Sequence, residues 1–190
     1  MKFYLIRHGR TDWNDLNHIQ GKSDIPLNDT GIAQAKELAD IIKADKLPIK
    51  HIYSSPLKRA TQTADILAAK LGLTYHILDD LREVDLGLWE GHTWAEIAEQ
   101  YPGNYNEWRI NRRYTKVHGG ESYDDMFIRS LKALKELAAT HSDDVAIVTH
   151  SAVIMALLCY FDNAPFELMK NYKVHNASIT ILDSSQVIEA

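Results

Sequence analysis

Two histidines and two arginines stand at points of the sequence where short apolar runs end. Arg7 and His8 follow the run FYLI, His150 follows DVAIVT, and Arg59 comes shortly after HIYS. Arginine guanidinium groups bind phosphoryl oxygens in pairs, and a neutral imidazole can attack phosphorus. Brought together, these four side chains could bind a phosphate ester and accept its phosphoryl group.

The apolar runs before these residues predict buried strands, and helical patterns alternate with them. The strands are expected at 3–6, 51–54, 145–149 and 178–183, and the helices at about 31–45, 57–71, 122–139 and 152–161. This alternation predicts an α/β fold, a three-layer α/β/α sandwich with a mostly parallel central sheet. In such sheets ligands bind beyond the carboxyl ends of the strands, which is where the four side chains emerge.

The stretch from about 85 to 120 breaks the alternation. It is rich in Trp, Tyr and Gly and has no long apolar run, and we interpret it as a small cap inserted over the site in a single domain of residues 1–190. Within it, Thr93 and Glu96 predict a capping box at the start of a short helix. Earlier in the chain, Ser55 before Pro56 predicts a helix N-cap, which would put Arg59 in the first turn.

Composition excludes several classes of partner. The 190 residues carry a net charge of −5 and the basic residues form no long run, which argues against nucleic acid and anionic membranes. No stretch approaches the ~20 apolar residues of a membrane span, and the N-terminal apolar run is too short for a secretory signal, so we expect a cytoplasmic protein. Cys159, the single cysteine, excludes an internal disulfide and is expected in the core.

Seven sequence blocks carry a resemblance to a known family. In chain order they are LIRHGRTDWN (5–14), PLNDTGIAQA (26–35), IYSSPLKRATQTA (52–64), LREVDLGLWEG (81–91), GGES (119–122), VTHSAVI (148–154) and NASIT (176–180). With these blocks the chain resembles the histidine phosphatase superfamily, also called the phosphoglycerate mutase-like family. The blocks cover nearly the whole chain in the family's order.

The resemblance implies a role for each matching residue. His8 would be the nucleophile that becomes phosphohistidine, and Glu83 would be the proton donor, with a pKa raised by burial under the cap. A protonated His150 would help to stabilise the transition state. The residues implied at the phosphoryl group are Arg7, Asn14, Arg59, His150 and Ser151. No metal or other cofactor is required.

Residues nearer the cap are candidates for contacts with the rest of the substrate. They are Arg10, Thr11, Gly21, Trp94, Arg112 and Arg113. The Arg112-Arg113 pair resembles arginines that phosphoglycerate mutases use on the substrate carboxylate, and a solvated cap surface is the alternative. The tryptophans of the cap, Trp89, Trp94 and Trp108, are expected to form its core more than a surface for substrate.

Three functions remain open at this point. The first is a cofactor-independent phosphomonoesterase acting on a small phosphate ester. The second is a phosphoglycerate mutase, but Val84, Leu86 and Trp94 stand where mutases carry arginine, tyrosine and lysine. The third is a non-catalytic module that binds phosphorylated ligands. The natural substrate, among α-ribazole phosphate, phosphoglycerate, sugar phosphates or others, and the oligomeric state are left undecided.

Overall fold

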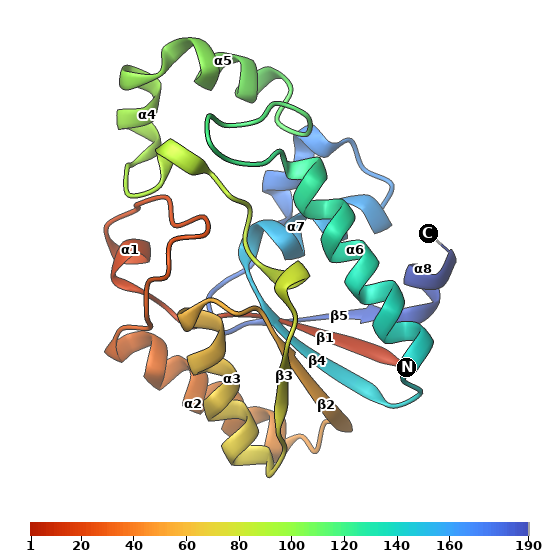
Figure 1. The fold of residues 1–190 in the computed structure, drawn as a ribbon. Helices are drawn as coiled ribbons and strands as arrows, with labels where there is room; N and C mark the ends of the chain where they lie inside the picture. The colour runs from red at the N-terminus through yellow and green to blue at the C-terminus, as the bar shows by residue number, and fades with distance from the viewer. Residues whose placement is uncertain (190) are drawn as a thin grey trace.

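A computed structural model describes residues 1–189, which form a five-stranded sheet with helices on both faces (Figure 1). The strand order is β3-β2-β4-β1-β5; β5 runs antiparallel to β1, and the other neighbouring pairs are parallel. The strands are β1 (Lys2–Arg7), β2 (Ile49–Ser54), β3 (Tyr75–Ile77), β4 (Asp144–Thr149) and β5 (Ile179–Asp183). The predicted α/β fold with a mostly parallel sheet is confirmed.

Alternating side chains of β1 divide the core into two layers. Tyr4 and Ile6 pack in one apolar cluster with residues of α2 (Asp29–Ala44) and α3 (Lys58–Leu71). Phe3 and Leu5 pack in the other, with residues of α6 (Tyr123–Thr140) and α7 (Ser151–Phe161). Because successive side chains of a strand point to opposite faces, an unbroken apolar run is what a strand covered on both sides requires.

The sheet order brings the functional strand ends together. β4 lies between β1 and β2, with Arg7 opposite Thr149 and Ser54 opposite Val148. The residues that follow each strand therefore emerge side by side at one edge of the sheet. This edge lies directly below the cap in Figure 1.

The cap, residues 85–120, contains a 3₁₀ turn, η2 (Gly87–Trp89), and two short helices, α4 (Trp94–Gln100) and α5 (Pro102–Ile110). The expected capping box is present, since the Thr93 hydroxyl accepts from the Glu96 amide at 3.3 Å and the Thr93 amide donates to the Glu96 carboxylate at 2.7 Å. Trp89 and Trp108 are buried, whereas Trp94 is 38% exposed. The core of the cap therefore contains Trp89 and Trp108, and Trp94 is partly exposed at its surface.

Seven short elements have no counterpart among the predicted ones: β3, η2 and α5, described above, and α1 (Asp12–Asp15), η1 (Asp79–Leu81), η3 (Phe166–Tyr172) and α8 (Ser184–Glu189). The predicted N-cap at Ser55 is wrong. Helix α3 starts at Lys58 with Leu57 at the N-cap and no side-chain cap, although Arg59 does lie in the first turn. Within residues 1–189 no single helix is long and apolar enough to span a membrane; α7 and η3 pass that test only together, bent by 118°.

Candidate active site

His8 is held in one orientation by the main chain. Its amide donates to the Thr149 carbonyl at 3.1 Å, and its Nδ1 lies 2.7 Å from the Gly9 carbonyl oxygen. A carbonyl oxygen can only accept, so Nδ1 carries the proton and Nε2 keeps its lone pair. Burial and the charges of Arg59 and Arg7 lower the pKa of His8 well below its ordinary value. The side chain is therefore a neutral imidazole with its Nε2 available as a nucleophile.

Gly9 allows this turn because the chain after β1 passes close to α2. A Cβ on Gly9 would lie 2.4 Å from the Gly31 carbonyl oxygen, closer than any side chain could fit. Its amide donates to the Thr63 hydroxyl at 3.1 Å, and that hydroxyl donates to the Arg59 carbonyl at 2.8 Å. The nucleophile loop and the first turn of α3 are thereby tied together.

Arg59 is fully buried, and its guanidinium is held by two backbone carbonyls. Nη2 donates to Gly21 at 2.6 Å and Nη1 donates to Ser23 at 2.7 Å. Burial lowers its pKa to about 10, which still leaves the group charged at neutral pH. Arg7 is held in the same way, since its Nη1 donates to the Val174 carbonyl at 2.8 Å.

Three nitrogen atoms of the basic side chains in the site are buried and, within residues 1–189, have no hydrogen-bond partner: Arg7 Nε, Arg59 Nε and His150 Nδ1. Buried polar atoms in proteins almost always have a hydrogen-bond partner, so three unpartnered atoms in one site need an explanation. All three belong to residues whose type and position point to an anion. An anion with several oxygens can act as their acceptor, and a phosphoryl group fits that description.

His150 lies beside the nucleophile, with 5.2 Å between the two ring centres. Its Nε2 is 2.7 Å from the Ser55 hydroxyl, so Ser55 orients this ring instead of capping α3. Burial and the charges of Arg59, His8, Arg129 and Arg7 lower the pKa of His150 well below its ordinary value. The expected protonated form of His150 therefore requires a bound anion, because the positive charges around the ring disfavour another one on it.

Glu83 faces these cations from the loop after η1. Its Oε1 accepts from the Val84 amide at 3.0 Å and its Oε2 from the Ala152 amide at 3.3 Å, at the start of α7. Burial raises the pKa of this carboxyl, and the charges of Arg59 and Arg7 together with the two amides only partly oppose the rise. The predicted direction of the shift is confirmed. A carboxyl with a raised pKa can hold a proton for transfer.

Arg129 on α6 holds the loop that carries Glu83, and no sequence block pointed to it. Its guanidinium donates to the carbonyls of Asp80 at 2.8 Å, Arg82 at 2.7 Å and Glu83 at 2.9 Å. It also pairs with Glu121 at 2.6 Å, and Glu121 accepts from the Asp85 amide at 3.0 Å. Glu121 lies in the GGES block, but the sequence predicted no contact for it. We call Arg129 and Glu121 the loop clamp.

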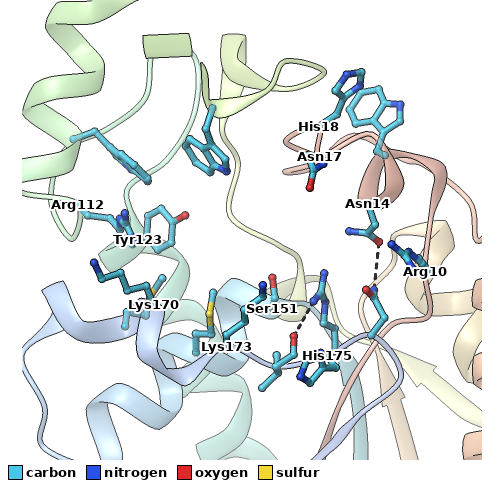
Figure 2. Close-up of a pocket in the computed structure, with 18 of the residues that line it drawn as sticks. Arg10, Asn14, Asn17, His18, Arg112, Tyr123, Ser151, Lys170, Lys173 and His175 are labelled. Atoms are coloured by element: carbon cyan, nitrogen blue, oxygen red, sulfur yellow. Dashed lines mark hydrogen bonds between the residues drawn. The ribbon is translucent and has the colours of Figure 1, made fainter. Parts of the chain in front are cut away.

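Asn14 lies near the loop that carries His8, and Asn176 contacts both. Its Oδ1 accepts from the Thr11 amide at 3.1 Å and from Asn176 Nδ2 at 3.3 Å, which leaves its own Nδ2 free to donate (Figure 2). Asn176, from the NASIT block, also donates to the carbonyls of His8 at 3.1 Å and Gly9 at 3.3 Å. Asn176 is therefore a positioning residue. It belongs to the NASIT block, but the sequence alone predicted no role for it.

Above these residues lies an open cavity of about 790 Å³ (Figure 2). Arg7, Asn14 and Ser151 line it, whereas the buried His8, Arg59 and His150 are not among its lining residues. The cap contributes Trp94 and Trp108, whose rings stack at 4.9 Å. We call the residues expected at the phosphoryl group, together with His8 and Glu83, the floor.

The structure separates the six candidates for contacts with the rest of the substrate. Arg10, Trp94 and Arg112 line the cavity, although Arg10 is also ion-paired with Asp15. The other three do not line it: Thr11 caps α1, Gly21 holds Arg59 through its carbonyl, and Arg113 pairs with Asp124 at 2.7 Å. Within residues 1–189 no three His, Cys, Asp or Glu side chains are grouped as metal ligands.

Comparisons with known proteins show the family to which the chain belongs. A family model described as histidine phosphatase superfamily (branch 1) matches residues 3–186. Two proteins of Arabidopsis thaliana are similar: phosphoglycerate mutase-like protein 4, 37% identical over 93% of this chain and 76% of the relative, and metal-independent phosphoserine phosphatase, 34% identical over 94% and 74%. Among solved structures, mycobacterial glucosyl-3-phosphoglycerate phosphatase with VO3 has a TM-score of 0.84 and 33% identity, covering 96% of this chain and 90% of that one.

Proposed function

The chain belongs to branch 1 of the histidine phosphatase superfamily, and on that basis we propose that it hydrolyses small phosphate monoesters through a phosphohistidine at His8. One observation carries the proposal. The imidazole of His8 is neutral, its Nδ1–H donates to the Gly9 carbonyl, and it lies beside the buried Arg59 and the half-buried Arg7. This is a nucleophile placed next to a site for an anion.

In the first half of the reaction Nε2 of His8 attacks phosphorus and the bond from phosphorus to the alcohol oxygen breaks. The phosphoryl oxygens accept hydrogen bonds from Arg7, Arg59 and Asn14. Glu83, whose pKa is raised, gives its proton to the departing alkoxide. The arginines stabilise the charge that spreads over the phosphoryl oxygens in the transition state.

In the second half water attacks the phosphorus of phosphohistidine and the bond from phosphorus to nitrogen breaks. Glu83, now a carboxylate, takes a proton from that water. His150 gains a proton when the dianion is bound, because the anion offsets the charges that lower its pKa in the free protein. Each group is then ready for another turnover.

The cap favours a hydrolase over a mutase, which must hold the dephosphorylated intermediate until it reorients. Val84 and Leu86, which stand at mutase arginine and tyrosine positions, are buried in the core and do not line the cavity. Arg113 is occupied by Asp124. With these anchors missing, water reaches phosphohistidine before the alcohol can return. We also place the protein in the cytoplasm, where a lone buried Cys159 stays reduced.

The test is to incubate the protein with 3-phosphoglycerate and EDTA, with and without a 2,3-bisphosphoglycerate primer, and to follow free phosphate and 2-phosphoglycerate. We expect phosphate release from this and other esters, with negligible isomer. Isomer that forms much faster than phosphate would show a mutase. Binding without either product would show a non-catalytic module.

A further inference from the structure

Thr149 connects the nucleophile to the proposed proton donor through one buried residue. It is the last residue of β4, and its exposed fraction is 0%. Its carbonyl accepts from the amide of His8 at 3.1 Å, and His150 follows it directly in the chain. The backbone of Thr149 therefore fixes both histidines relative to β4.

The hydroxyl of Thr149 contacts a different catalytic element. Its Oγ1 donates to the carbonyl of Leu81 at 2.7 Å, in a buried hydrogen bond between residues 68 positions apart in the chain. Leu81 ends η1, and Glu83 follows two residues later. Because a carbonyl oxygen can only accept, the hydroxyl is the donor and its orientation is fixed. Thr149 thus links the end of β4 to the loop that carries Glu83.

The turn after Thr149 also holds the side chain of Glu83. Glu83 Oε2 accepts from the Ala152 amide at 3.3 Å, in the first turn of α7 and three residues after Thr149. The chain from Thr149 to Ala152 therefore contacts the Glu83 loop at two points, one on its backbone and one on its carboxyl group. These two contacts set the distance between that carboxyl group and the strand ends that carry the histidines.

The loop clamp supports the same loop from another side. Arg129 donates to three of its backbone carbonyls, and Ser130 Oγ donates to the Asp80 carbonyl at 3.2 Å. Both residues belong to α6, so these hydrogen bonds join the loop to a helix that covers the sheet. The Thr149 hydroxyl instead joins the loop to the sheet itself. We therefore assign the fold of the loop to α6 and its distance from the nucleophile to Thr149.

The hydrogen bond explains why this buried strand position carries a hydroxyl. The four residues before it, 145–148, are apolar and buried, and valine matches threonine in shape except for the hydroxyl. A valine at position 149 would leave the Leu81 carbonyl without its donor, and a buried acceptor without a partner is costly. The side chain of Thr149 therefore does more than fill space.

We propose that Thr149 is a positioning residue, whose hydroxyl holds the carboxyl group of Glu83 at the distance from His8 that proton transfer to the leaving oxygen requires. This rests on the proposed function, in which Glu83 protonates the departing alkoxide. Thr149 itself touches neither the substrate nor the reacting atoms. Without its hydroxyl the loop shifts relative to the nucleophile, so proton transfer slows while Arg7 and Arg59 still bind the phosphoryl group.

The experiment uses two substitutions at one position. Thr149→Val removes the hydroxyl and keeps the shape, with Thr149→Ala in its place if the valine variant does not fold, and Thr149→Ser keeps the hydroxyl. The control is Thr140→Val, because the Thr140 hydroxyl also donates to a backbone carbonyl, that of Glu136 at 2.9 Å, but within α6. Each variant is assayed on glycerol 3-phosphate, an alkyl ester, and on p-nitrophenyl phosphate, whose leaving group needs little protonation. Melting temperatures verify that the variants are folded.

We expect kcat/KM for glycerol 3-phosphate to fall about tenfold or more in Thr149→Val, and that for p-nitrophenyl phosphate to fall less than about threefold, as for a general acid that is present but misplaced. Thr149→Ser restores the wild-type ratio between the two esters, and Thr140→Val keeps it. An unchanged ratio in Thr149→Val, with or without a lower melting temperature, overturns the proposal, as does a changed ratio that Thr149→Ser does not restore.

The titration of Glu83 separates this proposal from the proposed function, because it needs no turnover. The carboxyl ¹³C resonance of Glu83, assigned with Glu83→Gln, reports its protonation. Burial raises the pKa of this carboxyl, so a loop that shifts toward solvent should lower that pKa by about half a pH unit or more. If no ester is hydrolysed but Thr149→Val lowers the pKa and Thr149→Ser does not, the hydrolase fails and the role of Thr149 stands. If esters are hydrolysed while both the ratio and the pKa are unchanged in Thr149→Val, the role of Thr149 fails alone.

Discussion

The floor of the cavity and one of its walls both collect arginines, but they hold them in opposite ways. We call the wall residues Arg109, Arg112 and Lys170 the basic seam. Arg59 is buried and Arg7 is half-buried, and backbone carbonyls fix their guanidinium groups. Arg112 and Lys170 are partly or fully exposed, and no carboxylate among residues 1–189 pairs with them. Fixed charges suit a transition state, whose geometry does not vary between substrates, whereas exposed charges suit the variable remainder of a substrate.

The two regions also differ in how they are supported. The floor is built from the ends of three neighbouring strands, and their register sets its geometry. The seam joins the end of a short cap helix to a 3₁₀ segment, two elements that the sheet does not position. We therefore expect substitutions in the floor to act on kcat for every ester, and substitutions in the seam to act on selectivity.

The largest effect is expected for His8→Ala, which removes the nucleophile. Turnover should fall by at least on the order of 10⁴-fold, because the remaining binding groups cannot replace a covalent step. Circular dichroism should show an intact fold. Labelled substrate quenched without acid should leave acid-labile, base-stable phosphate on the wild type and none on the variant. A variant that keeps a tenth of the activity would refute the covalent mechanism.

Arg7→Lys is expected to cost on the order of 10²-fold in kcat/KM, because lysine keeps the charge and loses the paired hydrogen bonds. The comparison with the seam is direct. Arg112→Lys should reduce kcat/KM less, and only for esters with a second anion, since the resemblance implies that Arg112 contacts the substrate carboxylate. Steady-state kinetics on 3-phosphoglycerate, which carries that carboxylate, and on glycerol 3-phosphate, which does not, measures both variants. Equal losses in the two variants would mean that the floor and the seam do not differ.

Part of the floor could be predicted because the ends of buried strands can be recognised in the sequence. An apolar run followed by Arg-His or His-Ser indicates which residues emerge at a strand end. The pattern does not show which strands are neighbours; that order comes from the structure. The position of Arg59 was predicted from a helix N-cap at Ser55. That N-cap is wrong, because Ser55 does not cap α3 but contacts His150. The predicted position of Arg59 survived that error because the helix still begins one residue before it.

The loop clamp, β3 and the basic seam could not be predicted in this way. Arg129 lies in a long amphipathic helix, where one arginine resembles any other solvated charge, and its partners are backbone carbonyls 46 to 49 residues away. Lys170 lies in a 3₁₀ segment that has no clear periodicity. Contacts that depend on tertiary packing and carry no residue-type signal are invisible to pattern reasoning.

Arg129→Met tests whether the loop clamp is needed for proton donation by Glu83. Without the guanidinium, the loop that carries Glu83 loses three backbone contacts, so proton donation should fail first. We expect kcat for an alkyl phosphate to fall about 10- to 100-fold. The aryl ester p-nitrophenyl phosphate, whose leaving group needs little protonation, should lose less, and KM should change little for both.

Lys132→Met is the matched control, since Lys132 reaches the same loop only through an exposed ion pair with Asp80 at 3.6 Å. It should leave the ratio between the alkyl and aryl esters unchanged. Equal losses on both esters in Arg129→Met, in proportion to a lower melting temperature, would assign Arg129 a role in stability alone.

The buried histidines predict a pH dependence of stability that the exposed seam should not share. Folding lowers the pKa of His8 and His150 below the ordinary 6.5, so the unfolded chain binds their protons more readily. Their contribution to stability is fully present above pH 6.5 and is lost as the pH falls below it. Melting temperatures between about pH 7.5 and 5.5 should therefore fall more in the wild type than in His150→Gln, by a few degrees. Parallel curves would contradict the neutral state of His150.

The smallest effect is expected at Ser151, the first residue of α7, whose side chain lines the cavity beside the floor. The backbone N–H at a helix start, not the hydroxyl, is the group suited to a phosphoryl oxygen. Ser151→Gly should therefore change kcat/KM within about threefold. Ser151→Asp keeps the same N–H and adds a carboxylate that repels the dianion, so it should lose on the order of 10²-fold. A tenfold loss in Ser151→Gly would show that the hydroxyl itself holds the phosphoryl group, and the floor would then depend on a rotatable side chain at a point where we expect only fixed donors.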